Sequence, residues 1–142
     1  MDRTRNPGPG PCRKPNFFIL GAGKCGTTTL YDCLRRHPGI FLPAVKEPSF
    51  FCESFQVVAN PVDYFRLFQD VDQEEAVGEA SHVYMSNPSS AGVLCTLFPE
   101  ARFVVILRNP VDRAYSLYHH MRRTGYERAP SFEKALRAEE QR

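Results

Sequence analysis

The sequence predicts an α/β fold in which helices flank a central parallel β-sheet. Two apolar stretches, 17–20 and 103–107, are typical of buried strands, and a helical pattern follows each of them. Strands that alternate with helices favour parallel pairing, because each helix provides the crossover between neighbouring strands. The chain has 142 residues, which is enough for one domain with a core of its own.

The first half of the chain is expected to contain a strand at 17–20, a helix and a short extended segment at 40–42. The helix is predicted to end near 37–39, because a proline disfavours helix at the residue before it. The pair Asn60-Pro61 is typical of a helix N-terminus, and this helix is expected to end at Phe68. Residues at helical spacing define the buried face of the first helix: Thr27, Leu30, Tyr31 and Leu34.

The second half is expected to contain strands at 76–80 and 103–107, the latter being the clearest strand of the chain. A helix that ends before Pro99 is predicted from four residues at helical spacing: Ala91, Leu94, Cys95 and Phe98. The pair Asn109-Pro110 is expected to begin another helix. Its predicted core stripe is Ala114, Leu117, Tyr118 and Met121. Ser131 is expected to cap a final, polar helix that runs to the end of the sequence.

Composition and charge narrow the class of protein. Hydrophobic residues make up 42% of the chain, as in globular proteins, and a formal charge of +2 does not imply a nucleic-acid partner. The sequence contains no apolar run long enough to span a membrane and no visible signal peptide. Residues 1–15 are rich in proline, glycine and basic side chains and are expected to form a disordered leader, so that the domain covers 16–142.

The cysteines argue against a disulfide scaffold or a zinc site, because their number is odd and no Cys-x-x-Cys pair occurs. Cys25 lies in the loop after the first strand, where its thiol is expected to be accessible. The others are expected to be small buried hydrophobic residues: Cys12, Cys33, Cys52 and Cys95.

The segment 21–29, Gly-Ala-Gly-Lys-Cys-Gly-Thr-Thr-Thr, predicts a phosphate-binding loop. Its glycines allow a sharp turn, and the backbone N–H groups and helix dipole that follow favour an anion. Lys24 adds a positive charge. Unlike a Walker A loop, the segment has Thr27 rather than lysine after Gly26, which argues against a magnesium-dependent nucleotide hydrolase. Arg108 follows the strand 103–107, so a second anion-binding group is expected at the same edge of the sheet.

Three segments together resemble the sulfotransferase family, especially its Golgi carbohydrate branch of heparan and chondroitin sulfotransferases. The segment 20–30 is similar to the family's 5′-phosphosulfate loop, and 107–116 is similar to its 3′-phosphate motif. The segment 46–51, Lys-Glu-Pro-Ser-Phe-Phe, is similar to the place where heparan-type enzymes carry a catalytic glutamate before two phenylalanines.

The resemblance implies a sulfotransferase that uses 3′-phosphoadenosine 5′-phosphosulfate (PAPS) as donor and needs no metal. It implies that Lys24 stabilises the leaving group, that Glu47 is the general base, and that Arg108 and Ser116 bind the 3′-phosphate. The residues that it places on the 5′-phosphosulfate are Lys24, Cys25, Gly26, Thr27, Thr28 and Thr29. The implied acceptor is a carbohydrate such as an anionic glycosaminoglycan, and the implied location is the Golgi lumen or membrane.

The resemblance also implies a P-loop-type fold and a domain about twice as long, of which residues 16–142 would be the N-terminal portion. Ala80 and Ser81 stand where heparan-type relatives often carry a lysine, so that extra donor is not expected here. Two alternatives stay open: a truncated, non-catalytic nucleotide-binding fragment and a P-loop NTPase or kinase. The adjacent pair His119-His120 is expected at the surface, and His82 is a candidate for the acceptor cleft.

Overall fold

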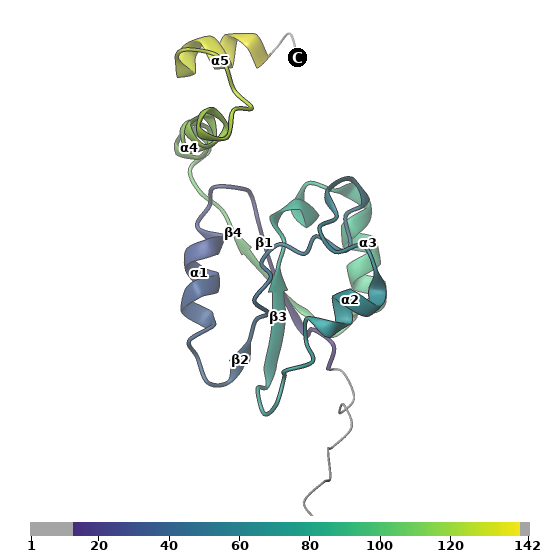
Figure 1. Cartoon of the computed structure of the whole chain (residues 1–142). Helices are drawn as coiled ribbons and strands as arrows, with labels where there is room; N and C mark the ends of the chain where they lie inside the picture. The colour runs from purple at the N-terminus through teal and green to yellow at the C-terminus, as the bar shows by residue number, and fades with distance from the viewer. Residues whose placement is uncertain (1–12, 140–142) are drawn as a thin grey trace, which may run out of the picture.

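A four-stranded sheet with the order β2-β3-β1-β4 lies at the centre of the structure, a computed structural model that describes residues 13–139 (Figure 1). Its strands are β1 (Phe17–Gly21), β2 (Ile40–Phe41), β3 (Ala76–Ala80) and β4 (Arg102–Ile106). All three strand pairs are parallel. The predicted α/β fold with a central parallel sheet is therefore confirmed.

Helices cover both faces of this sheet. The helix α1 lies on one face, whereas α2 and α3 lie on the other (Figure 1). Two further helices, α4 and α5, stand beyond the carboxyl ends of the strands (Figure 1). The helices are α1 (Thr27–Leu34), α2 (Pro61–Arg66), α3 (Pro88–Leu97), α4 (Pro110–Thr124) and α5 (Phe132–Glu139), with 3-10 turns η1 (Glu53–Phe55) and η2 (His82–Met85).

Three Asn-Pro pairs begin three of the helices in the same way. The side chains of Asn60, Asn87 and Asn109 each accept a hydrogen bond from the backbone N–H two residues further on, at 2.8, 2.9 and 3.0 Å. Proline at the first helical position costs nothing, because its missing N–H would have no partner within the helix. The sequence predicted this start at Asn60 and Asn109, and the structure adds Asn87.

The core is built around β1, whose side chains alternate between the two faces of the sheet. Ile19 packs with Tyr31 of α1 on one face. Phe18 packs with Leu94 and Phe98 on the other. Phe18 and Ile19 have no solvent exposure, and complete burial of such a side chain contributes about 1.5–3 kcal/mol to folding. The central position of β1 therefore fixes the loop that follows it.

The strand β4 differs from expectation, because its side chains are exposed rather than buried. Val104 and Val105 are 37% and 51% exposed. Within the described residues, β4 pairs only with β1 and lies at the edge of the sheet. The stacking of Phe103 on Phe18, with ring centroids 5.8 Å apart, covers only part of this strand.

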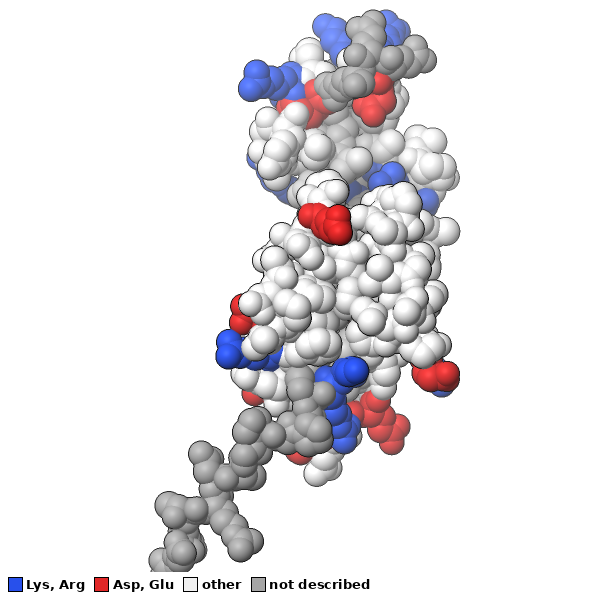
Figure 2. All heavy atoms as spheres, turned by 90° about the vertical axis from the view of Figure 1, so that its right-hand side faces the viewer, with Lys and Arg blue, Asp and Glu red and all other residues white. Residues whose placement is uncertain are grey.

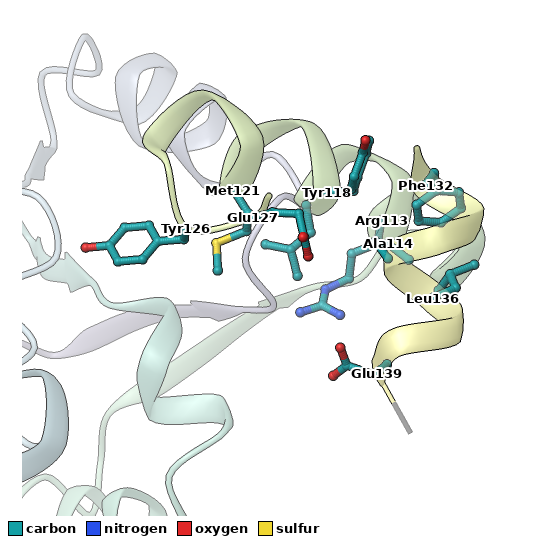
Figure 3. Close-up of a pocket in the computed structure, with 11 residues that line it drawn as sticks. Arg113, Ala114, Tyr118, Met121, Tyr126, Glu127, Phe132, Leu136 and Glu139 are labelled. Atoms are coloured by element: carbon teal, nitrogen blue, oxygen red, sulfur yellow. The ribbon is translucent and has the colours of Figure 1, made fainter. Parts of the chain in front are cut away.

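The prediction that a stripe of residues on α4 belongs to the core is also wrong. No described residue of α4 is buried. The stripe instead lines a pocket of about 470 Å³ between α4 and α5, in which Tyr118, Met121 and Phe132 form apolar walls (Figure 3). Ser131 precedes α5 as predicted, and its Oγ accepts from the Lys134 N–H at 3.3 Å.

Several smaller predictions can be compared with the described residues. The helix α1 ends at Leu34, and a turn continues to His37, whose N–H donates to the Leu34 carbonyl. The predicted leader 1–15 and the end of the last helix lie mostly outside residues 13–139. Within that range, no helix is long and apolar enough to cross a membrane.

The cysteine predictions were only partly right. Cys25 is buried, with 9% exposure, so the expectation of an accessible thiol is wrong. The loop turns its thiol inward rather than toward the pocket described below. Cys52 is buried as expected, whereas Cys33 and Cys95 are exposed. Cys12 lies outside the described residues.

Candidate functional site

A pocket of about 500 Å³ lies at the carboxyl ends of β1 and β4, where ligands bind in parallel α/β sheets. It brings together segments that are far apart in the sequence. The predicted site residues that line it are Lys24, Gly26, Thr27, Thr28, Thr29, Glu47, Arg108 and Ser116. Cys25 is the one predicted site residue whose side chain does not line this pocket.

The loop between β1 and α1 has the geometry of an anion cradle. Lys24 and Gly26 both have positive φ angles, of 70° and 93°, and the Cys25 N–H donates to the Ala22 carbonyl at 3.2 Å. Gly26 precedes α1 and provides no side-chain cap for its first N–H groups. These N–H groups and the helix dipole therefore favour an anion at the end of α1.

Gly21 is required where the loop leaves the sheet. A Cβ atom at this position would lie 2.9 Å from Thr27 Cγ2 and 3.0 Å from the Ile106 carbonyl oxygen. Only glycine lets β4 and the start of α1 approach the loop this closely.

Two arginines connect the loop to the end of β4 and to α4. Arg113 Nε donates to the Gly23 carbonyl at 3.1 Å, and Arg108 Nη1 lies 3.5 Å from the Lys24 carbonyl. Arg108 is exposed and lines the pocket beside Ser116. The two predicted anion-binding features thus line one pocket.

Glu47 is held in the pocket by two hydrogen-bonding partners. Its Oε2 lies 2.7 Å from His82 Nδ1, and its Oε1 lies 2.5 Å from Lys46 Nζ. Burial opposes ionisation, but the hydrogen bonds from His82 and Lys46 outweigh it and lower the pKa of Glu47 to about 2. The Glu47 side chain is therefore a carboxylate at neutral pH.

A second pocket, of about 630 Å³, meets the first at Glu47 and His82. Its walls are mainly apolar, and Phe55, Val57, Val83 and Met85 contribute to them. The two pockets differ in chemistry: one has cations, hydroxyls and backbone N–H groups, and the other is largely apolar. The arrangement can accommodate two substrates that meet at the Glu47–His82 pair.

Charge on the outer surface is unevenly distributed. Figure 2 shows that the face formed by α2 and α3 carries few charged side chains, whereas Lys and Arg gather near α4 and α5. Among residues 13–139, no group of three or more His, Cys, Asp or Glu side chains is placed to hold a metal ion. The cationic and N–H-rich first pocket fits a phosphate- or sulfate-bearing ligand.

Sequence reasoning missed two residues of the site, Arg113 and His120. It named His82 as a candidate for the acceptor cleft but did not predict its contact with Glu47, which joins segments 35 positions apart and leaves no local pattern. His120 lines the first pocket, and Arg113 lines the second. Helical spacing could have indicated His120, because it lies four residues after Ser116 and therefore on the same face of α4.

Comparison with known proteins agrees with this geometry. The model of the sulfotransferase domain family matches residues 14–141. The chain is 34% identical to the membrane-associated sulfotransferase kil1 of Dictyostelium discoideum, over 74% of this chain and 22% of that protein. It is 32% identical to human bifunctional heparan sulfate N-deacetylase/N-sulfotransferase 2, over 80% of this chain and 14% of that protein. With mouse carbohydrate sulfotransferase 15 the identity is 34%, over 73% of this chain and 27% of the relative.

A solved structure shows the same relationship. The sulfotransferase from Alicyclobacillus acidocaldarius is 40% identical and superposes with a TM-score of 0.83, covering 91% of this chain and 58% of that one. The chain thus spans about a quarter or less of the three curated relatives and a little over half of the solved structure. Because the family model matches nearly the whole chain and the fold agrees, the chain belongs to the sulfotransferase family.

Proposed function

We propose that this chain provides the donor site and the general base of a sulfotransferase that moves a sulfuryl group from PAPS to a carbohydrate. The main support for the proposal is that one pocket is lined by residues of the loop, among them Lys24, and by Glu47, Arg108 and Ser116. Carbohydrate sulfotransferases among the relatives support a carbohydrate acceptor, and a hydroxyl or amine of a glycosaminoglycan is the acceptor we propose. A Golgi location is proposed on the same basis.

The proposed donor site is the first pocket. The N–H groups from Gly26 to Thr28 and the hydroxyls of the loop are proposed to hold the 5′-phosphate. The Cys25 N–H already donates to the Ala22 carbonyl, and Cys25 does not line the pocket. Thr29 lines the pocket one residue further along α1. Arg108 and Ser116, which line the same pocket, are proposed to bind the 3′-phosphate.

Transfer is proposed to be an in-line displacement. The acceptor oxygen or nitrogen forms a bond to sulfur while the bond from sulfur to the 5′-phosphate oxygen breaks. Lys24 stabilises the negative charge that develops on this leaving oxygen. The acceptor proton passes to the Glu47 carboxylate, which shares its charge with His82. Positioning and electrostatic stabilisation account for the catalysis, as in phosphoryl transfer.

The acceptor is proposed to enter through the second, largely apolar pocket. The two pockets share Glu47 and His82, together with Gly23 and Leu117, whereas the threonines of the loop line only the first pocket. A sugar ring can place its apolar face against such walls while its hydroxyl reaches the base.

Calorimetric titration tests the proposal. The folded chain, checked by circular dichroism, is titrated with 3′-phosphoadenosine 5′-phosphate in EDTA and separately with Mg-ATP. Metal-independent binding of the bisphosphate supports the sulfotransferase site. A preference for Mg-ATP would instead support an NTPase, and a folded chain that binds neither would support a fragment without donor binding.

A further inference from the structure

Glu79 is a buried carboxylate with no place in the proposed reaction. It lies near the end of β3, has no solvent exposure, and lines neither site pocket. Three hydroxyls surround it. Tyr64 and Tyr84 donate to its Oε1 at 3.1 and 2.9 Å, and Ser81 donates to its Oε2 at 3.0 Å.

Two of these hydroxyls continue into the loop that carries Glu47. The Ser49 N–H donates to Ser81 Oγ at 3.0 Å, and the Phe51 N–H donates to the Tyr84 hydroxyl at 3.3 Å. Two hydrogen-bonded chains therefore run from backbone amides of the loop, through a hydroxyl, to the same carboxylate. The Tyr64 hydroxyl donates to Glu79 without extending to this loop.

The carboxylate determines the direction of both chains. Burial raises the pKa of Glu79 to about 7. Above that pH the group is ionised and only accepts hydrogen bonds, so each hydroxyl donates to Glu79 and keeps its oxygen free to accept the loop amide. A neutral group at this place would have to donate to at least one hydroxyl. That hydroxyl would then have to direct its own proton to another acceptor and accept two hydrogen bonds at once, so the bond from the corresponding loop amide would be weakened.

The loop needs such support because its backbone is strained. Glu47 and Ser49 have φ angles of 60° and 51°, which residues other than glycine rarely adopt. Ser49 is buried, so an unpaired amide there would also cost solvation. A further hydrogen bond, from the Glu47 N–H to the Ala80 carbonyl at 2.9 Å, joins the loop to the end of β3.

We propose that Glu79 is a positioning residue, which holds the Glu47 loop in its reactive conformation through Ser81 and Tyr84. This inference rests on the proposed function, because it assumes that Glu47 takes part in the reaction. It also explains why the Glu47–His82 contact is fixed: His82 directly follows Ser81, so the same network orients both partners.

Hydrogen exchange of backbone amides tests the network directly. The substitution Glu79→Gln places an NH₂ donor against hydroxyls that themselves donate. Whichever way the side-chain amide turns, at least one hydroxyl must accept a hydrogen bond from it, so the direction of that hydrogen bond reverses. At pH 8, where Glu79 is ionised, we expect the Ser49 or Phe51 amide, or both, to exchange roughly tenfold faster or more in the variant, while amides of β1 keep their protection. Unchanged protection of both loop amides would overturn the proposal.

Three hydroxyl deletions provide matched variants. Ser81→Ala and Tyr84→Phe each remove a hydroxyl that links Glu79 to the loop, and Tyr64→Phe removes one that does not. All three delete one hydrogen bond to the same carboxylate, but only Ser81→Ala and Tyr84→Phe also remove the acceptor of a loop amide. If Glu79 served stability alone, kcat of the folded protein should be similar in all three. Positioning instead predicts that Ser81→Ala and Tyr84→Phe lower kcat by about tenfold to a hundredfold, and that Tyr64→Phe leaves kcat nearly unchanged.

Turnover is followed as conversion of PAPS to the bisphosphate with N-desulfated heparin as acceptor, and bisphosphate affinity is measured for each variant. Lower kcat with unchanged bisphosphate affinity supports positioning. An effect of Tyr64→Phe as large as the other two would overturn it. If the wild-type chain binds no bisphosphate, the proposed function fails, and the exchange experiment still decides whether Glu79 holds the loop.

Discussion

Nδ1 of His82 lies 2.7 Å from Oε2 of Glu47, although the two residues belong to separate segments. Glu47 lies in the loop after β2, and His82 begins the 3-10 turn after β3. This contact uses one carboxylate oxygen, and Lys46 uses the other. The base proposed for the reaction is therefore a pair, in which the carboxylate orients the imidazole and the imidazole shares the carboxylate's charge.

Substitution of Glu47 by Gln should lower turnover by about a hundredfold to ten-thousandfold, the usual contribution of general-base catalysis. Gln keeps the size of the side chain but cannot accept the acceptor's proton. Bisphosphate affinity should change little, because Glu47 does not donate to the donor phosphates. Glu53→Gln, which alters an exposed glutamate in the 3-10 turn of the same segment, is the control. Unchanged turnover in Glu47→Gln would remove Glu47 from the role of base.

Substitution of Lys24 by Ala should abolish measurable transfer, because no other lysine lines the pocket among the described residues. Alanine and lysine are similarly disfavoured at a φ of 70°, so the loop should keep its stability. Thermal unfolding checks this, and Lys134→Ala in α5 controls for loss of an exposed positive charge. Near-normal turnover in Lys24→Ala would show that the leaving oxygen is stabilised by another group.

Substitution of Arg108 by Ala should weaken binding of the 3′,5′-bisphosphate by about tenfold to a hundredfold, the value of a charge-assisted hydrogen bond. Binding of adenosine 5′-phosphate should not change, because it lacks the 3′-phosphate. Calorimetry with both nucleotides distinguishes a direct contact of Arg108 with the 3′-phosphate from an effect of Arg108 on the loop. Equal weakening for both would mean that Arg108 acts on the loop, through its contact with the Lys24 carbonyl, rather than on the 3′-phosphate.

Local sequence patterns were sufficient to predict most of the fold. β1 and β3 have the predicted locations. The apolar run of β1, bounded by a turn signal, is typical of a buried parallel strand, whereas β3, with Gly78 and Glu79 in its sequence, gave a weaker signal. The Asn-Pro pairs located two helix starts, since their capping geometry depends on neighbouring residues alone. The glycine-rich segment also predicted the loop, because the positive φ angles that such a loop needs depend on the residues of the segment itself.

The errors concern contacts between distant segments. The composition of β4 predicted burial, but exposure depends on which elements lie beside a strand, and the described residues place only β1 there. The stripe of α4 has helical spacing, yet its partner is the short helix α5 across a pocket rather than the sheet. The His82–Glu47 contact and the bonds that join Ser81 and Tyr84 to the Glu47 loop connect residues more than 30 positions apart, so no periodicity could have revealed them.

Glu79 should make the stability of the fold depend on pH between about 4.5 and 7. Burial raises its pKa from an ordinary value of 4.5 to about 7, although hydrogen bonds from Tyr84, Ser81 and Tyr64 oppose this. In that range the folded chain binds more protons at this site than the unfolded chain does. The contribution of Glu79 to the unfolding free energy is therefore largest below pH 4.5 and is lost as the pH rises through 7.

The total change should approach about 3 kcal/mol, since each unit of pKa corresponds to about 1.4 kcal/mol. Denaturant unfolding of the wild type and Glu79→Gln at pH 5 and pH 8 measures it, because the other titrating groups are present in both proteins and largely cancel. The stability of the wild type relative to the variant should fall from pH 5 to pH 8. Glu47 does not interfere: its pKa of about 2 confines its own effect to pH values below about 4.5. A difference between the two proteins that stays constant with pH would show that Glu79 has the same pKa in the folded and unfolded chains.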